Sequence, residues 1–266
     1  MVELKIEEQK KLMLEVLLDF DSICRSRDIK YSLAYGTLLG AIRHKGYIPW
    51  DDDIDVIVTR DDYTKLTKIA NTLLKPNHTF INVETNQCFS APLGKIIDNT
   101  TLLIQNGHFS DKVDLGVYID VFVYDWIPTN IDKQRKVLSK AVLLQRIWSF
   151  LGNNYGNHNR IISLIRGMLN RTNFARKVSL YTNKWAQTVS KDREMMGSLL
   201  FGATNRVEET MKYSDFCDLV DYVFEGCHFL GIRNADYYLK QWYGDYMTLP
   251  PVENRVSNHA TKVYKR

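Results

Sequence analysis

Residues 31–63 read YSLAYGTLLGAIRHKGYIPWDDDIDVIVTRDDY, and the acidic run in this stretch decides how the rest of the chain is interpreted. The β-branched residues after the run predict a strand from Ile54 to Val58. Because side chains on a strand alternate between its faces, Asp53 and Asp55 are expected on one face and Ile54 on the other, toward the core. Two carboxylates on one face repel each other unless a cation lies between them. Their oxygens suit Mg²⁺ or Mn²⁺.

A third acid interrupts another apolar stretch, GVYIDVFVYD, at residues 116–125. This acid, Asp120, stands inside a strand predicted from Val117 to Tyr124. A buried carboxylate without a partner is costly, so Asp120 is expected to have one. If this strand pairs beside Ile54–Val58, Asp120 completes a three-carboxylate metal site of the kind that carries two-metal phosphoryl chemistry. The alternative for Asp120 is a structural hydrogen-bonding role.

Candidates for holding a phosphate lie on both sides of the acidic run. Gly36 and Thr37 are expected where a strand meets a helix, where a glycine lets the backbone approach a phosphate and a hydroxyl and helix N-terminus can hold it. Arg43, just before the acids, and Lys95, in PLGKIID, are further cationic candidates. A surface or salt-bridge role is the alternative for Lys95. The candidates for acid–base chemistry are His44, His108 and His259, which no catalytic motif frames.

Three other interpretations of the acidic run are open. In the first interpretation, the acidic run is a solvated turn, but a turn does not explain the strand that follows it. The second is the opening of a calcium loop, although Val56 replaces the required glycine and position twelve is Asp62 instead of Glu. In the third, Asp-x-Asp is the metal motif of a glycosyltransferase.

The remaining pattern predicts helices and strands mixed on one chain. Helices are expected over Glu3–Arg27, over Asp62–Leu74 with Asp61 as N-cap, and from Asn234 to Trp242 with Gly244 closing it. Further strands are expected near residues 29–35, 79–84, 94–97, 222–224 and 228–232, and the tail after residue 249 is expected to be irregular. The predicted fold class is α/β (α+β), a mixed sheet flanked by helices.

Charge is distributed unevenly along the chain. Its formal net charge is +4, yet no Asp or Glu occurs between Lys133 and Lys191. This basic stretch, mostly helical by pattern, indicates an anionic partner, and a solvated basic face is the alternative. No nucleic-acid recognition motif accompanies it, so no nucleic acid is expected. We therefore divide the chain into a catalytic core over 1–130, a basic, mostly helical insertion over 131–213, and a C-terminal segment over 214–266 that returns to the core.

Several classes of protein are excluded by the composition. The N-terminus lacks a secretory signal, and no apolar stretch approaches the ~20 residues of a membrane span, so a cytoplasmic protein is expected. The four cysteines form no CxxC pair, which argues against a zinc site or a disulfide scaffold. Hydrophobic residues make up 45% of the chain, as in ordinary globular proteins.

Residues 35–63 closely resemble the signature of the LicD family, and the later pieces PLGKIIDNTTL, GVYIDVFVYD and YGDYMTLPP resemble its downstream blocks in the same order. The resemblance implies a nucleotidyltransferase-like fold. It also implies transfer of phosphocholine from CDP-choline to a sugar hydroxyl in a lipid-linked anionic glycopolymer precursor, of teichoic acid or lipopolysaccharide, with CMP leaving. Gly36 and Thr37 match the glycine turn of the family, Asp53 and Asp55 its paired metal ligands, and Asp120 its third carboxylate.

The resemblance carries further expectations. Choline is a quaternary cation, so an aromatic cage is expected, with Trp50 as the named candidate among Tyr47, Phe109, Tyr124 and Trp126. A lipid-linked precursor lies at the inner face of the cell membrane, where the basic segment would make a peripheral contact with the polymer or the anionic leaflet. Two alternatives remain: transfer of another phospho-polyol or nucleotide group from a CDP-linked donor, and a non-catalytic glycopolymer-binding protein.

Overall fold

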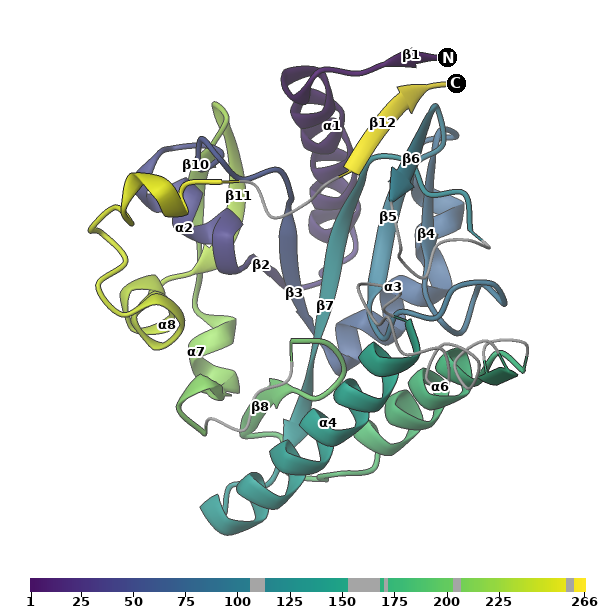
Figure 1. The fold of residues 1–266 in the computed structure, drawn as a ribbon. Helices are drawn as coiled ribbons and strands as arrows, with labels where there is room; N and C mark the ends of the chain where they lie inside the picture. The colour runs from purple at the N-terminus through teal and green to yellow at the C-terminus, as the bar shows by residue number, and fades with distance from the viewer. Residues whose placement is uncertain (106–112, 153–167, 170–171, 203–206, 257–260) are drawn as a thin grey trace.

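The computed structural model of the 266-residue chain describes residues 1–105, 113–152, 168–169, 172–202, 207–256 and 261–266. A mixed sheet forms the centre of the fold (Figure 1), and its strand order is β2–β3–β7–β5–β4. The five strands are β2 (Tyr31–Leu33), β3 (Asp55–Thr59), β7 (Tyr118–Ile127), β5 (Gly94–Asp98) and β4 (His78–Ile81). Helices flank this sheet, which confirms the predicted α/β (α+β) class.

The strand that carries the acidic run lies beside the strand that carries Asp120. Strands β3 and β7 are parallel, and Asp55 is the register partner of Asp120. The structure thus meets the condition that the sequence analysis set for a three-carboxylate site, which was the pairing of these two strands. The other pairs on this path are antiparallel, and β5 places Lys95 opposite Asp120 from the other side. Three chemically active side chains therefore share one level of the sheet.

Strand β7 is long enough to have different neighbours along its length. Residues 118–124 pair with β5 and β3, whereas Tyr124–Ile127 pair with β8 (Met195–Ser198). Strand β8 in turn pairs with β9 (Met211–Lys212). The middle part of the chain thus contributes strands to the central sheet as well as helices, and its proposed boundaries at 131 and 213 stay a prediction.

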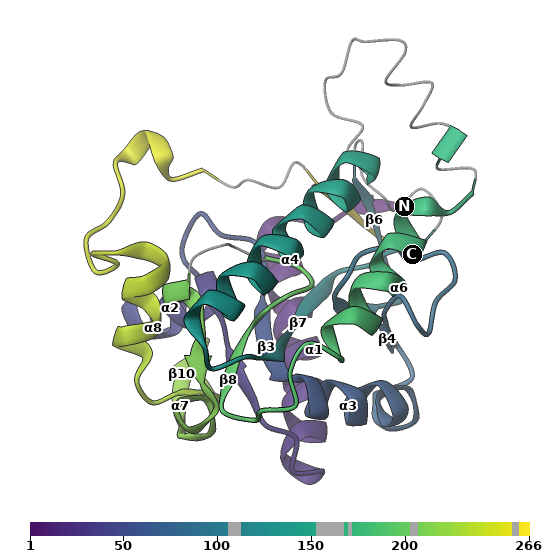
Figure 2. The same ribbon diagram turned by 90° about the horizontal axis from the view of Figure 1, so that it is seen from below.

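Helices lie on both sides of the sheet (Figure 2). Helix α1 (Ile6–Ser26) packs on β5 and β7, and α3 (Arg60–Leu73) packs on β3, β4 and β7. Helices α4 (Ile131–Gly152) and α6 (Phe174–Ala186) pack against each other on the opposite side of β7. None of the helices in the described residues is both long and apolar enough to cross a membrane.

The C-terminal part of the chain packs against the start of the core. Strands β10 (Leu219–Phe224) and β11 (Cys227–Ile232) form a hairpin, and β11 packs on β2. The backbone N–H of Ile232 donates to the Ser32 hydroxyl at 3.1 Å. Helix α2 (Tyr35–Arg43) packs on β10, and α7 (Tyr213–Cys217) packs on β11. Helix α8 (Ala235–Tyr243) packs on α2 and on the 3₁₀ turn Val207–Glu209, and a second 3₁₀ turn spans Val252–Asn254. Helix α8 has Asn234 as N-cap and Gly244 as C-cap, as predicted.

Two sequence-based expectations are wrong in this part of the fold. The tail is not irregular throughout, because β12 (Thr261–Lys265) pairs with both β1 (Val2–Glu3) and β6 (Thr101–Gln105). Helix α3 begins at Arg60, and its N-cap is Thr59 instead of Asp61. The Thr59 hydroxyl accepts from the backbone N–H of Asp62 at 3.2 Å, which satisfies an unpaired N–H of the first turn. The strand in the tail depends on partners distant in sequence, which local pattern does not reveal.

Candidate active site

A pocket of about 630 Å³ brings the predicted acids together. Asp53, Asp55, Lys95 and Asp120 all line it. Asp53 lies two residues before β3, Asp55 is the first residue of β3, Asp120 lies in β7, and Lys95 lies in β5. Side chains from α4 and α8 complete the walls. The structure therefore places residues from widely separated segments of the chain around one cavity.

Asp55 is the most confined of the acids. It is 9% exposed, and its backbone N–H donates to the Thr37 hydroxyl at 2.8 Å. Burial raises the pKa of Asp55 well above its usual range, and the charges of Asp53, Asp120 and Asp51 raise it further. Carboxylates crowded in this way favour a proton or a metal cation between them. Thr37 itself is 3% exposed and fixes the start of β3.

Lys95 and Asp120 form an ion pair inside the pocket. The Lys95 Nζ lies 2.5 Å from Asp120 Oδ1 and 3.4 Å from the centroid of the Tyr118 ring. Burial alone would lower the pKa of Lys95, but Asp120 and Tyr118 outweigh it, and the pKa is raised. The expected partner of Asp120 is therefore Lys95, and the lysine stays protonated where it faces the cavity.

Gly36 gives one further acid room to approach. A Cβ atom at this position would lie 2.5 Å from Asp51 Oδ2. The residue before it, Tyr35, has a φ of 43°, in the left-handed region that a bulky side chain seldom adopts. The turn from β2 into α2 is thus shaped by the acidic run that it faces. The proposed contact of Gly36 with a phosphate stays a prediction.

Among the predicted binding residues, Lys95 lines this pocket, whereas Gly36, Thr37, Arg43 and Trp50 do not. Arg43 and Trp50 instead contact the C-terminal part of the chain. Arg43 donates from Nη1 to the carbonyl of Tyr246 at 2.5 Å and from Nε to His44 Nε2 at 2.9 Å. The guanidinium of Arg255 lies 5.5 Å from the centroid of the Trp50 ring. Both residues thus anchor the C-terminal part of the chain to the loop before the acids. Their proposed contacts with a substrate stay predictions.

The other aromatic candidates in the described residues also lie outside the pocket. Tyr124 is fully buried, Trp126 is 6% exposed, and Tyr47 donates to the backbone carbonyl of Lys10 at 2.9 Å. None of the three lines the pocket. Phe109, like His108 and His259, lies outside the described residues.

The pocket is lined by a wall of aromatic rings, which the sequence analysis did not predict. The rings touch in succession, and we call them the aromatic wall: Trp242, Tyr35, Phe122, Phe201 and Trp148. Adjacent centroids lie 4.8, 5.0, 5.9 and 5.5 Å apart. All five rings line the cavity, and Tyr243 lies beside the acids, whose charges together with burial raise its pKa. The wall gives the pocket an apolar, π-rich surface beside its carboxylates.

The part of the chain that carries the acids matches a known family. Residues 28–126 match the family model described as LicD/FKTN/FKRP, nucleotidyltransferase domain. This range contains Asp53, Asp55, Lys95 and Asp120. We call residues 28–126 the LicD-family domain, after the model that they match.

Relatives of the LicD-family domain extend the comparison beyond this range. Over 276 residues, the chain is 28% identical to "Lipopolysaccharide cholinephosphotransferase LicD" of Haemophilus influenzae, and 99% of each protein is covered. It is also 42% identical over 59 residues to an uncharacterized protein of Rickettsia typhi, covering 22% of this chain and 19% of that protein. A match of 39% over 66 residues joins it to an uncharacterized protein of Rickettsia prowazekii, covering 24% of this chain and 25% of that protein.

The side chains of the LicD-family domain suit a hard divalent cation. Asp53, Asp55 and Asp120 offer only carboxylate oxygens, the ligands that Mg²⁺ and Mn²⁺ prefer. Burial, and then the charges of the neighbouring acids, raise the pKa of Asp55. As they lie in the described residues, no three His, Cys, Asp or Glu side chains are grouped closely enough to hold a metal ion. The donor chemistry fits a cation, and these three acids are the residues that would hold it.

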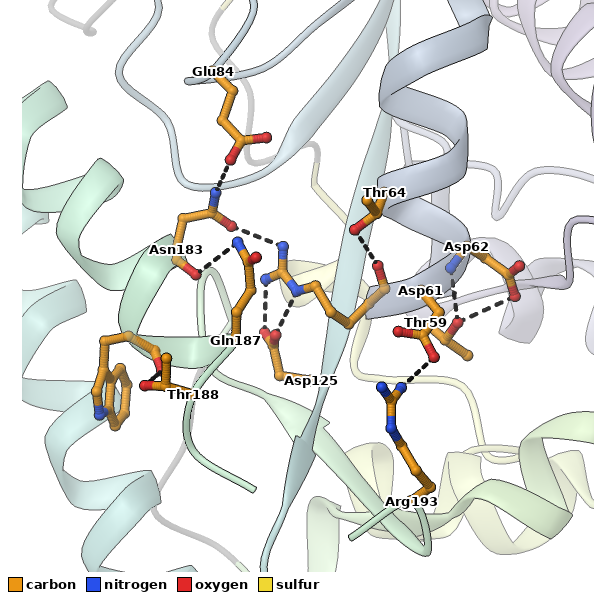
Figure 3. A network of polar contacts seen from close by, with 12 residues as sticks. Thr59, Asp61, Asp62, Thr64, Glu84, Asp125, Asn183, Gln187, Thr188 and Arg193 are labelled. Carbon is orange, nitrogen blue, oxygen red and sulfur yellow. Dashed lines mark hydrogen bonds and ion pairs between the residues drawn. The ribbon is translucent and has the colours of Figure 1, made fainter. Parts of the chain in front are cut away.

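A second buried charge pair ties the LicD-family domain to α6 (Figure 3). Arg60, at the start of α3, donates to both carboxylate oxygens of Asp125 in β7, at 2.6 and 3.1 Å. Its Nη1 donates to Asn183 Oδ1 at 2.8 Å, and Asn183 Nδ2 donates to Glu84 at 2.7 Å. Sequence reasoning did not single out Asp125. The signal was a second acid in the apolar strand that carries Asp120, with an arginine directly after β3.

Proposed function

We propose that this protein transfers phosphocholine from CDP-choline to a sugar hydroxyl of a cell-surface glycopolymer precursor. The observation that carries the proposal is one pocket that joins three carboxylates and a lysine to an aromatic wall. The printed name of the full-length relative, a lipopolysaccharide cholinephosphotransferase, supports the same reaction class. The bond formed joins the acceptor oxygen to phosphorus, and the bond broken joins that phosphorus to the oxygen that leaves with CMP.

The acids and the lysine have separate roles in the proposed reaction. Asp53 and Asp55, with Asp120, would hold Mg²⁺ or Mn²⁺, which supplies positive charge to the diphosphate of the donor. Asp120 reaches into the same cavity and is the group for accepting the proton of the attacking hydroxyl. Lys95 fixes the Asp120 carboxylate through their ion pair and adds a second positive charge beside the phosphates. Thr37 holds Asp55, the first residue of β3, in place through its hydroxyl.

The aromatic wall supports choline as the transferred group. A quaternary ammonium cannot donate a hydrogen bond, and the faces of Trp and Tyr rings attract it through their negative quadrupole. Tyr35 and Trp242 offer such rings near the acids, which add attraction for a cation. A polyol group would instead need hydrogen-bonding side chains along this wall, so we place transfer of another phospho-polyol or nucleotide group second.

The acceptor is proposed to be a lipid-linked anionic polymer, a precursor of lipopolysaccharide or teichoic acid. The acid-free stretch from Lys133 to Lys191 gives the protein a basic part that would attract such a polymer or the anionic inner leaflet of the cell membrane. A peripheral position at the inner membrane face, on the cytoplasmic side, would bring enzyme and acceptor together. Binding of the polymer without catalysis is the remaining alternative.

The test is release of CMP from CDP-choline by the purified protein with Mg²⁺ and a lipopolysaccharide or teichoic acid precursor. The wild type is compared with Asp53→Asn and Asp55→Asn, and with Asp192→Asn as a control for loss of one exposed charge. We expect both pocket variants to lose at least ~100-fold in rate, as removal of charge stabilisation at a reacting phosphate does. The control variant is expected to match the wild type.

Each other outcome has a distinct meaning. Release from a different CDP-linked donor but not from CDP-choline would keep the site and change the transferred group. Equal release by the wild type and both pocket variants would show that the acids are not the catalytic centre. Binding of the polymer without any release would support the non-catalytic alternative.

A further inference from the structure

Helix α4 presents two different faces. Its inner face reaches the active-site pocket through Gln145, Trp148 and Ser149. Figure 2 shows the central sheet, α1 and α3 on one side of α4. Because residues four and seven apart share a face of a helix, the outer face is formed by Leu143, Ile147 and Phe150. The same helix is thus a wall of the pocket and part of the molecular surface.

The outer face is apolar at its centre. Leu143 is 57% exposed, Ile147 37% and Phe150 43%. Three large apolar side chains exposed together on one helix face are unusual for a soluble surface, where such residues normally occur singly. A surface of this kind indicates a site of association.

Basic residues border this apolar strip. Arg135, Lys136 and Arg146 are all exposed on the same helix. Asp132, in the first turn of α4, is the last acid in the sequence before Asp192. An apolar strip bordered by Lys and Arg is the pattern of a helix that lies in the plane of a membrane interface, with its apolar side chains in the acyl boundary and its cations at the headgroups.

We infer that the outer face of α4 docks on an anionic lipid bilayer. Leu143, Ile147 and Phe150 enter the interface, and Arg135, Lys136 and Arg146 contact the headgroup phosphates. The inference rests on the proposed function only in naming the lipid-linked acceptor as the reason for docking. The contact itself follows from the composition of the helix face.

The apolar strip decides between a bilayer and other anionic partners. A soluble polyanion, whether glycopolymer or nucleic acid, is bound by cations alone and gains nothing from exposed Leu or Ile. A bilayer uses both kinds of side chain, because burial of apolar groups adds to attraction by the surface potential. The two contributions can be separated by substitution.

Docking through α4 has a geometric consequence. Trp148 lies on the same helix one residue after Ile147, yet it lines the pocket and donates from Nε1 to the carbonyl of Ser90 at 2.7 Å. The pocket wall is therefore one helix diameter, about 10 Å, from the bilayer interface. An acceptor on a lipid carrier would reach the acids without leaving the membrane.

The experiment is co-sedimentation of the full chain with vesicles of phosphatidylcholine alone, or of phosphatidylcholine and phosphatidylglycerol at a ratio of about two to one. One double variant, Leu143→Ser with Ile147→Ser, shortens the apolar strip. A second, Arg135→Glu with Lys136→Glu, reverses two charges. Matched controls are Met247→Ser with Val252→Ser, which are 56% and 72% exposed elsewhere, and Lys11→Glu with Lys68→Glu, which are exposed on α1 and α3.

We expect the wild type to bind the anionic vesicles and to bind neutral ones at least ~tenfold more weakly. Each α4 variant should lose ~tenfold or more in partitioning, while both controls stay within about twofold of the wild type. Equal binding to both vesicle types would overturn the inference. So would loss of binding in the charge variant alone, because that result indicates a surface for soluble polyanions.

The readout also separates this inference from the proposed reaction. CMP release with a detergent-solubilised acceptor is measured for the same variants, and thermal unfolding checks that they fold. Loss of vesicle binding with CMP release retained supports docking independently of catalysis. Unchanged vesicle binding in the Leu143→Ser, Ile147→Ser variant contradicts docking even where the transferase activity is confirmed.

Discussion

Asp55 and Asp120 stand opposite each other as register partners on the parallel strands β3 and β7. A shift of the pairing by one residue would turn one carboxylate to the other face of the sheet. The apolar residues around them prevent that shift, since Val56, Ile119 and Val121 are all fully buried. The hydrophobic pattern that specifies the register therefore also positions the acids.

The ion pair of Lys95 and Asp120 gives the first prediction. Lys95→Met leaves Asp120 without its cation in a site where the two side chains are 11% and 16% exposed. We expect a loss of about 3–5 kcal/mol in the free energy of unfolding, as for other broken buried pairs. Urea denaturation measures the change.

A double-mutant cycle isolates the pair. Lys95→Met combined with Asp120→Asn removes both charges, so most of the lost stability should return while CMP release stays abolished. If the double variant is no more stable than Lys95→Met, the ion pair is not what the single substitution disrupts.

Gly36 and Gly40 allow a comparison within one helix. An added methyl group at Gly36 meets a carboxylate oxygen of Asp51, whereas one at Gly40 meets the backbone carbonyl oxygen of Gly46. A side chain can move and backbone cannot, so Gly40→Ala should cost about 1–3 kcal/mol of stability. Gly36→Ala should cost less stability but lower the rate of CMP release, because Asp51 is displaced toward the acids. Thermal unfolding and the rate assay together test the contrast.

The aromatic wall predicts which tryptophan recognises the donor. Trp242→Leu removes a ring of the wall and should raise KM for CDP-choline by about 3–30-fold, the range of a cation–π contact. Trp50→Leu changes a ring outside the pocket and should leave KM unaltered. Steady-state kinetics decide between the two positions. A rise in KM for Trp50→Leu alone would show that Trp50, as the sequence analysis proposed, binds the choline group and that Trp242 does not.

His44 gives a pH dependence. Burial, and then the charge of Arg43, lower the pKa of His44 below its usual value of 6.5. Because the folded pKa is below the unfolded one, the stabilisation from neutral His44 is present above pH 6.5 and is lost as pH falls through the folded pKa. His44→Gln still accepts the hydrogen bond of Arg43 but does not titrate. The difference in melting temperature between the wild type and this variant should therefore change between pH 7.5 and about 5. A constant difference would contradict this.

The pair of Arg60 and Asp125 predicts a loss of stability without a direct loss of chemistry. Asp125 is fully buried and Arg60 is 5% exposed, so Asp125→Ala leaves an uncompensated guanidinium between β7 and α6. We expect a cost of about 3–5 kcal/mol. Since neither residue lines the pocket, KM for the donor should stay unaltered at a temperature where the variant is folded. Asp61→Ala, which removes the exposed partner of Arg193, is the mild control.

Local pattern was enough to predict the strands that carry Asp55 and Asp120, whereas their pairing was only the condition for a three-carboxylate site. An acid in an apolar strand stands out in the sequence, and so do the Asn and Gly that bound α8. The aromatic wall could not be found in this way, because Tyr35, Trp148, Phe201 and Trp242 come from distant segments and each is an ordinary core residue by local pattern. Local pattern also misdirects the choice of a cage residue, since Trp50 is favoured only by its place beside the acids in the sequence. Its ring instead meets Arg255, which only the folded chain brings near.

Ile127 and Met195 are register partners at the end of β7 and the start of β8, so the chain that contains α4 and α6 leaves the sheet and returns to it at one pair of residues. For protein engineering, the pair of Ile127 and Met195 is a junction at which the segment that contains α4 and α6 could be exchanged. Loop closure depends only weakly on loop length, so this helical lobe can change in length at this strand pair if the contacts of Asn183 with Arg60 and of Trp148 with Ser90 are kept. Replacing the lobe would alter one wall of the pocket and the outer face of α4 while β3 and β7 keep their register. New acceptor specificities are therefore open to modular exchange of this lobe, without any change in the strands that hold the acids.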